Sequence, residues 1–471
     1  MKTTLTYGLC VALLLAVCSP YSGDPPNRED IVTEINEWTA WDMANAVAEG
    51  DVSAEDLTRA CLDKIAAREA DVGAWAHLDT ETALAQARER DAYRAAGHPL
   101  DLLHGVPVGI KDIIDTADMP TESGSDHFKG RRPTRDATCV ALLRAAGAVI
   151  LGKTVTTEFA MTGARGTRNP HDPNRTPGGS SSGSGAAVAD HMVPLALGSQ
   201  TGGSVIRPAS FCGVHGYKPT YGCISRHGVF ILARALDHIG VYANSLSDLA
   251  MIGDVLMVRD KGDLDMRAHP GGRLVEALAE PGPAAPRLAF VKGPPWAYAD
   301  DYMDTLFATY LDQLGGIPEV ELAGIFDHAL DAQATVMNAN VWMNLRDYVE
   351  NHEDDLLPET VRRAIAGRDV PAADYIAARE LTDSLAAALD GLFEHYDALI
   401  TAGAPGEAPL GLDSTGNAAF QRIWTLTGVP TITLPLLQGP NGMPIGVQVI
   451  GRKGRDGDLM RAARWVEEQG A

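Results

Sequence analysis

The fold of this chain is decided by residues 175–210, which read RTPGGSSSGSGAAVADHMVPLALGSQTGGSVIRPAS. Two clusters rich in serine and glycine stand out, GGSSSG at 178–183 and TGGS at 201–204. A flexible linker is the ordinary interpretation of such composition, but an apolar segment and a second glycine cluster follow at once. Consecutive backbone N–H groups beside a serine form a site for an anion. A serine nucleophile needs such donors for the oxyanion of acyl transfer, so the stretch indicates catalysis.

The segment between the two clusters brings them together. Residues 183–190 are predicted as a helix of small residues and 193–197 as an apolar strand. The helix spans about 12 Å and the strand returns over about 16 Å. The chain therefore comes back near its starting point, where Ser180 can face Ser204.

These motifs resemble those of the amidase signature family, whose members hydrolyse amides with a Ser–Ser–Lys triad. PGGSSSGSG at 177–185 and TGGS are joined by a third match, HGVPVGIKD at 104–112, which has a lysine in the family's G-[IV]-K-D context. The resemblance extends from Trp38 to the C-terminus. It includes GKTVTTEFA at 152–160 and the closing segment LTGVPTITLPLLQGPNGMPIGVQVIGR at 426–452.

The resemblance implies a role for each residue of the triad. Ser204 would attack the amide carbonyl, Ser180, held through a cis peptide bond, would relay its proton, and neutral Lys111 would be the final base. The oxyanion would be held by the backbone N–H groups of Thr201, Gly202 and Gly203, with that of Ser204. The resemblance implies neither a metal nor an organic cofactor.

The sequence around Lys111 supports its assignment as a base. Apolar residues alternate along 105–111, which predicts a strand with Lys111 at its end. Burial lowers the pKa of a lysine, and a neutral amine can accept a proton.

Three positions depart from the family pattern. Ser182 stands where the family usually has glycine, Gln200 stands where it has aspartate, and Arg207 comes one position later than usual. None of these replaces a member of the triad, so we expect activity to be kept.

Two other enzyme types match short patterns. Residues 179–183 satisfy the G-x-S-x-G motif of an α/β-hydrolase esterase with Ser181 as nucleophile. The acid and base would then come from Asp237 and His238 or from His328 and His395, the latter two in helical runs. GAVILGKT at 147–154 satisfies the P-loop pattern, but its intervening residues are themselves a strand, which argues against a nucleotide site.

A third hypothesis is the amidase subunit of a tRNA-dependent amidotransferase, which resembles this sequence and works only with partners. Against it stand the net charge of −23, which disfavours nucleic acid, and an N-terminal leader. Residues 1–23 carry a short apolar run after Lys2, which predicts a signal peptide or, with Cys18, a lipoprotein leader. We therefore expect export to the periplasm or a lipid-anchored state, with a cytoplasmic location as the alternative.

Composition and pattern predict an α/β protein. Residues 24–471 are expected to form one large domain with a mixed β-sheet covered by helices on both faces. A variable helical region near 260–400 would shape the pocket for a small-molecule amide. The sequence leaves open whether two copies of the chain form a homodimer. Helices are predicted at 38–50, from Ser53 with Asp56 as its capping partner, and at 80–96, 136–147, 245–258, 332–349, 372–392 and 456–468, with a helix start at 152–159. Strands are predicted at 148–151, 287–292, 398–401, 431–436 and 445–450, and alternating strand and turn signals follow Ser204.

Four cysteines lie outside the leader, namely Cys61, Cys139, Cys212 and Cys223. The pair Cys212 and His215 has no second pair to complete a zinc site. We expect the four cysteines to be buried free thiols. If the protein is exported, a disulfide between two of them is the alternative.

Overall fold

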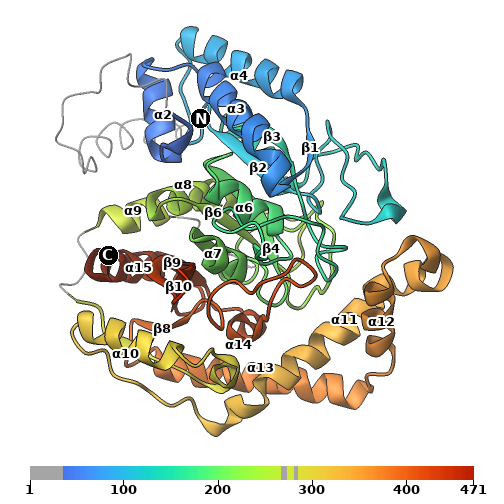
Figure 1. Cartoon of the computed structure of the whole chain (residues 1–471), viewed down its shortest axis with the longest axis vertical. Helices are drawn as coiled ribbons and strands as arrows, with labels where there is room; N and C mark the ends of the chain where they lie inside the picture. The colour runs from blue at the N-terminus through green and yellow to red at the C-terminus, as the bar shows by residue number, and fades with distance from the viewer. Residues whose placement is uncertain (1–34, 267–272, 281–284, 471) are drawn as a thin grey trace.

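The computed structural model describes residues 35–266, 273–280 and 285–470 (Figure 1). The predicted leader at 1–23 lies outside these residues and stays a prediction. Among the described residues, no helix combines the length and the apolar character needed to cross a bilayer.

The described strands form one ten-stranded mixed sheet, as predicted, in the order β1-β3-β2-β4-β6-β5-β9-β10-β8-β7. β2 pairs in parallel with β3 and β4, β7 pairs in parallel with β8, and the other neighbours are antiparallel. The strands are β1 (Trp75–Leu78), β2 (Pro107–Lys111), β3 (Val149–Thr154), β4 (Leu195–Gln200), β5 (His215–Lys218), β6 (His238–Ala243), β7 (Leu288–Phe290), β8 (Ala398–Ala402), β9 (Thr431–Gln438) and β10 (Pro444–Ile450).

Helices cover both faces of this sheet. They are α2 (Ala40–Glu49), α3 (Ala54–Val72), α4 (Thr80–Ala95), α5 (Thr138–Ala145), α6 (Ser182–Ala189), α7 (Ile206–Cys212), α8 (Leu246–Leu256), α9 (Leu274–Ala279), α10 (Met303–Gln313), α11 (Ala329–Asn351), α12 (Pro358–Arg368), α13 (Ala372–Leu392), α14 (Ala419–Thr427) and α15 (Asp456–Gly470). In Figure 1, α11, α12 and α13 form an elongated arm beside the sheet-bearing body.

Neighbouring residues of β4 show how the two faces are filled. Ala196 packs in a cluster with α6 and α7, whereas Leu197 packs in a second cluster with α8 and α15. Successive side chains of a strand point to opposite faces. Because helices cover both faces, the central strands are buried along their whole length.

Local signals placed many helices correctly. Ser53 and Asp56 form the predicted capping box of α3, Ser245 caps α8, and α13 has the predicted bounds. A capping side chain satisfies an N–H group that the helix itself leaves unpaired, so this signal depends only on nearby residues.

Two local predictions were wrong. The expected helix start at 152–159 is absent, because β3 continues through Thr154 between β1 and β2. The strand and turn pattern expected after Ser204 is wrong for 206–212, which form helix α7, and holds only further on, where β5 at 215–218 is followed by turns. The side chain of Gln200 accepts hydrogen bonds from the N–H groups of Val205 and Ile206. Pro208 lies in the first turn of α7, where a missing N–H does no harm.

The four cysteines outside the leader are buried thiols that form no disulfide, as predicted. Burial disfavours the charged thiolate, and it raises the pKa of Cys61 and of Cys139 to about 12. These thiols contribute to packing.

Candidate active site

Lys111 ends β2 inside the protein, with no exposed surface. Its Nζ lies 2.7 Å from Ser180 Oγ and 2.8 Å from Ser199 Oγ. Burial holds the pKa of Lys111 well below its usual value, and the charge of Asp237 opposes this effect. The amine is therefore suited to accept a proton from a hydroxyl.

Ser180 lies in the loop that leads into α6. The peptide bond between Gly179 and Ser180 is cis, which agrees with the expectation from the family resemblance. The carbonyl of Ser180 accepts a hydrogen bond from the N–H of Thr157 at 3.2 Å. Arg207 donates to the carbonyl of Gly179. The backbone around Ser180 is thus held on both sides.

Ser204 lies in the bend between β4 and α7 and is largely buried. β4 carries Ser199, which contacts Lys111, five positions before Ser204. Arg207, three positions after Ser204, contacts the residue before Ser180. The predicted serine and lysine segments therefore meet at the end of β4.

The segment 201–204 presents free backbone donors. Its carbonyl groups are occupied, since Thr201 O accepts from Gln333 at 3.2 Å and Gly202 O accepts from Thr425 at 2.7 Å. Within the described ranges, no hydrogen bond uses the amide N–H of Gly202, Gly203 or Ser204. Unpaired N–H groups beside a serine are what an oxyanion requires.

The departures from the family pattern leave this framework complete. Gln200 caps α7 with its oxygen, and its amide nitrogen donates to Thr425 Oγ1 at 3.0 Å. Arg207 is buried without a carboxylate partner among the described ion pairs, and burial lowers its pKa to about 10. Ser182 Oγ reaches the carbonyl of Val155 at 3.4 Å.

Asp237 is a residue whose role the sequence did not reveal. Its carboxylate accepts from Thr201 Oγ1 at 2.6 Å and from the N–H groups of Leu232 and Ala233 at 2.8 and 2.9 Å. Burial raises the pKa of Asp237 to about 6 despite these bonds. Asp237 lies 36 positions from Thr201 in the chain, and no short motif links them.

Ser181 and His238 are not arranged as the nucleophile and base of an α/β-hydrolase. Ser181 Oγ bonds the backbone of Ser199 at 3.2 Å, and His238 Nδ1 lies 2.6 Å from Leu236 O. In the described part of the chain, no histidine is hydrogen-bonded to Ser181. Ser181 therefore packs between α6 and β4.

The P-loop pattern also has a structural explanation. Lys153 lies within β3, and its Nζ donates to Ile114 O at 2.8 Å and to Thr121 Oγ1 at 2.6 Å. It also pairs with Asp112 at 3.2 Å. These contacts occupy the amine and hold the chain that follows Lys111.

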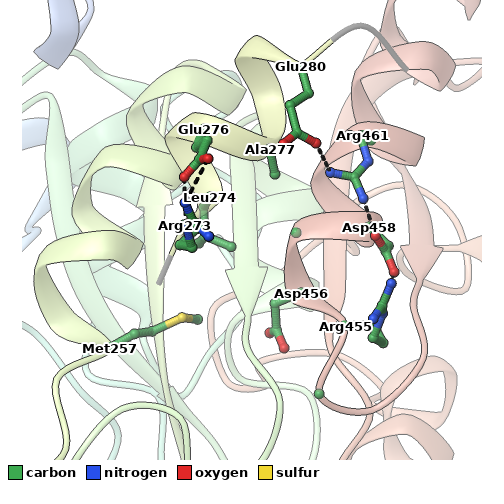
Figure 2. Close-up of a pocket in the computed structure, with 12 residues that line it drawn as sticks. Met257, Arg273, Leu274, Glu276, Ala277, Glu280, Arg455, Asp456, Asp458 and Arg461 are labelled. Atoms are coloured by element: carbon green, nitrogen blue, oxygen red, sulfur yellow. Dashed lines mark hydrogen bonds and ion pairs between the residues drawn. The ribbon is translucent and has the colours of Figure 1, made fainter. Parts of the chain in front are cut away.

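A separate surface hollow lies between α9 and α15 (Figure 2). Its charged side chains pair with one another, as Arg461 does with Glu280 and Asp458. None of the predicted catalytic residues lines it. The hollow is therefore separate from the serine and lysine segments at the end of β4.

Comparison with known proteins agrees with this geometry. The family model described as Amidase matches residues 56–460. A glutamyl-tRNA(Gln) amidotransferase subunit from Chloroflexus aggregans is 34% identical, with 91% of this chain and 96% of the relative covered.

Solved structures of other proteins share the fold over most of this chain. A chain from a vestigial protein complex linked to the origins of an s-triazine catabolic enzyme has a TM-score of 0.86 and 30% identity, with 92% of this chain and 99% of that chain covered. The 6-aminohexanoate cyclic dimer hydrolase complexed with substrate has a TM-score of 0.82 and 26% identity, with 92% and 97% covered.

Proposed function

The chain belongs to the amidase family of enzymes that act on carbon–nitrogen bonds, and from this premise we propose that it hydrolyses a carboxylic amide through an acyl-enzyme on Ser204. Ser180 and Lys111 form the proton relay in this proposal. The substrate is a small-molecule amide, which yields a carboxylic acid and ammonia or an amine.

The observation that carries the proposal is the contact between Lys111 and Ser180. Their Nζ and Oγ atoms are 2.7 Å apart, a distance over which a proton can transfer. Burial keeps the amine neutral to a lower pH than an exposed lysine would allow. The two neighbours of the Lys111 amine are serine hydroxyls, which can pass a proton to it.

Acylation follows from this relay. Ser204 Oγ bonds to the amide carbon while its proton moves to Ser180 Oγ, and the proton of Ser180 moves to Lys111 Nζ. The carbonyl oxygen becomes an oxyanion that the backbone N–H groups of residues 201–204 stabilise. When the carbon–nitrogen bond breaks, the proton returns through Ser180 to the leaving amine. Water then repeats the sequence on the ester and releases the acid.

A serine-directed fluorophosphonate tests the nucleophile by mass-spectrometric mapping of the labelled residue. We expect the label on Ser204, with labelling lost in Lys111→Ala and turnover reduced at least about 10⁴-fold in Ser204→Ala. Ser182→Ala is the matched control, because this serine begins α6 two positions after Ser180 and has no role in the relay. Label on Ser181, or full activity of Ser204→Ala, would contradict the proposal.

A second candidate shares this chemistry and differs in its partners. The named sequence relative is an amidotransferase subunit that aligns over nearly its full length, which favours this candidate over a free-standing amidase. In that role the chain would hydrolyse an amide inside a complex and pass the ammonia to a tRNA-bound acceptor. The expectation that nucleic acid plays no part would then be wrong.

The two candidates differ in what the isolated chain can do. Ammonia release by the purified chain from a panel of simple aliphatic and aryl amides supports the free-standing amidase. Ammonia release from glutamine only after partner subunits and glutamylated tRNA are added supports the amidotransferase role. Ser204→Ala should abolish either activity and is the control for both arms.

The location of the protein is also a proposal. We propose that residues 1–23 direct export, on the basis of their short apolar run after Lys2. N-terminal sequencing of the protein from cell fractions tests this. An intact N-terminus in the cytoplasmic fraction would contradict it.

A further inference from the structure

A cluster of two histidines and one aspartate lies outside the catalytic region. His127 belongs to the short 3-10 helix η3 (Asp126–Phe128), and His352 and Asp355 follow α11, at the start and the end of η6 (Glu353–Asp355). One nitrogen of each histidine and one carboxylate oxygen lie within 4.8 Å of one another. The two segments are 225 positions apart in the chain. We propose that this cluster binds one divalent transition-metal ion of the zinc class.

The distances suit such an ion. Two ligands of a tetrahedral zinc ion, with bonds of 2.0–2.1 Å, lie about 3.3 Å apart. His127 Nδ1 is 3.3 Å from Asp355 Oδ2, and His352 Nδ1 is 4.0 Å from the same oxygen. His127 and Asp355 already have this spacing, so the exposed side chain of His352 is the one that would move to complete the triangle.

The chemistry of the donors selects the class of ion. Imidazole nitrogen with one carboxylate suits zinc, cobalt, nickel and copper, whereas magnesium and calcium prefer oxygen ligands alone. Within the described residues, the ion pairs of Asp355 are with the two histidines only, so no lysine or arginine occupies the carboxylate. Glu353 and Asp354 add negative charge beside it.

Packing orients the histidine that is least exposed. The ring of His127 lies 5.1 Å from the rings of Phe128 and Tyr348, and 4.5 Å from the ring of His352. Only 17% of the side chain of His127 is exposed, whereas about half of His352 and Asp355 faces solvent. Water can therefore complete the coordination of a three-ligand site.

The ion would connect two segments of the chain that already contact each other through the buried side chain of Glu158. Glu158 accepts from Ser125 Oγ at 2.9 Å and from the N–H of Leu357 at 2.9 Å. It thus joins the segment 112–135, which follows Lys111, to the connection between α11 and α12. The proposed ion would join the same two segments at the surface. This role lies outside the amide chemistry and does not depend on the proposed function.

Metal binding is tested on the tag-free full chain after removal of metals with EDTA and dialysis. Isothermal titration with zinc chloride should give one ion per chain with an affinity in the micromolar range. Cobalt(II) chloride should give a visible absorption band typical of nitrogen and oxygen coordination. Saturating zinc should raise the unfolding temperature, because an ion that binds only the folded state stabilises it.

Matched variants locate the ion. His352→Gln and Asp355→Asn are at exposed positions, and each should weaken zinc binding by at least about 10-fold, as loss of even an outer-shell partner can do. His395→Gln, at an exposed histidine outside the cluster, should bind zinc as the parent does. No binding by the parent at millimolar zinc would overturn the proposal, and so would unchanged binding in both cluster variants.

Discussion

Replacing Asp237 by asparagine should stabilise the protein and change its pH dependence. The side chain is buried, with 7% of the residue exposed, and burial raises its pKa from 3.8 to about 6. At about 1.4 kcal/mol for each pH unit between these values, keeping the carboxylate ionised costs the folded state about 3 kcal/mol. Asparagine keeps an oxygen for the N–H groups of Leu232 and Ala233 and an amide group for the hydroxyl of Thr201.

The sign of this effect depends on pH. The pKa of Asp237 is higher in the folded state than in the unfolded state, so between about pH 4 and pH 6 the folded state binds more protons. The free-energy cost of an ionised Asp237 in the folded state is therefore fully present above pH 6. It declines as the pH falls from about 6 to about 4. Asp237→Asn should therefore be more stable than the parent by up to about 3 kcal/mol at pH 8, with a difference that shrinks towards pH 4.

Urea unfolding from pH 4 to pH 8 measures the stability, and the pH profile of kcat/KM measures the effect on Lys111. The charge of Asp237 raises the pKa of Lys111, so its removal should move the acidic limb of the profile to lower pH. Asp248→Asn is a matched control, because Asp248 is also buried, in α8, and its pKa is likewise raised to about 6. It should gain stability without a change in the profile. A less stable Asp237→Asn at pH 8, or an acidic limb that stays in place, would refute the reasoning.

Three further outcomes test other parts of the structure. Lys111→Met should lose activity yet be more stable than the parent at pH 7 in urea unfolding. Since burial depresses the pKa of Lys111 in the folded state, this gain in stability should fall as the pH approaches 10.5. A destabilised variant would count against a neutral buried amine. Arg207→Lys loses the planar guanidinium group that donates to the carbonyls of Gly416 and Gly179, the residue before Ser180. In steady-state assays kcat should therefore fall by about 100-fold. An unchanged kcat would show that Arg207 does not position the loop that carries Ser180. Gly183→Ala would place a methyl group against the carbonyl of Ala74 and should yield insoluble or strongly destabilised protein on expression. Gly391→Ala, in α13 with open space around it, should instead gain about 0.5–1 kcal/mol in urea unfolding; equal behaviour of the two variants would refute the packing argument.

Local signals in the sequence were sufficient for many elements. The capping pair Ser53 and Asp56 fixed the start of α3, and the apolar periodicity of 372–392 fixed α13. Both depend on side chains within a few positions of one another. The motif residues Lys111, Ser180 and Ser204 were also visible, because a short pattern carries each of them.

Where distant strands decide the outcome, local signals failed. Residues 152–154 have the appearance of a helix start, yet their backbone pairs with β1 and β2. Helix α7 begins where the side chain of Gln200 caps it from the end of β4, and the prolines and glycines nearby suggested turns instead. In the first case pairing with distant strands outweighed a local preference. In the second case the cap is a local contact, five and six positions from Gln200, that the nearby prolines and glycines obscured.

By itself, the sequence determined the α/β class, and it supplied the residues of the proposed triad and the order in which they occur along the chain. Only the tertiary structure decided that burial lowers the pKa of Lys111, that Asp237 faces Thr201, and that His127 meets His352 and Asp355. The physical reason is that a pKa and a ligand distance depend on which segments exclude water or approach one another. Those segments lie tens to hundreds of positions apart, so their contact is a property of the folded sheet and its helices rather than of any short stretch.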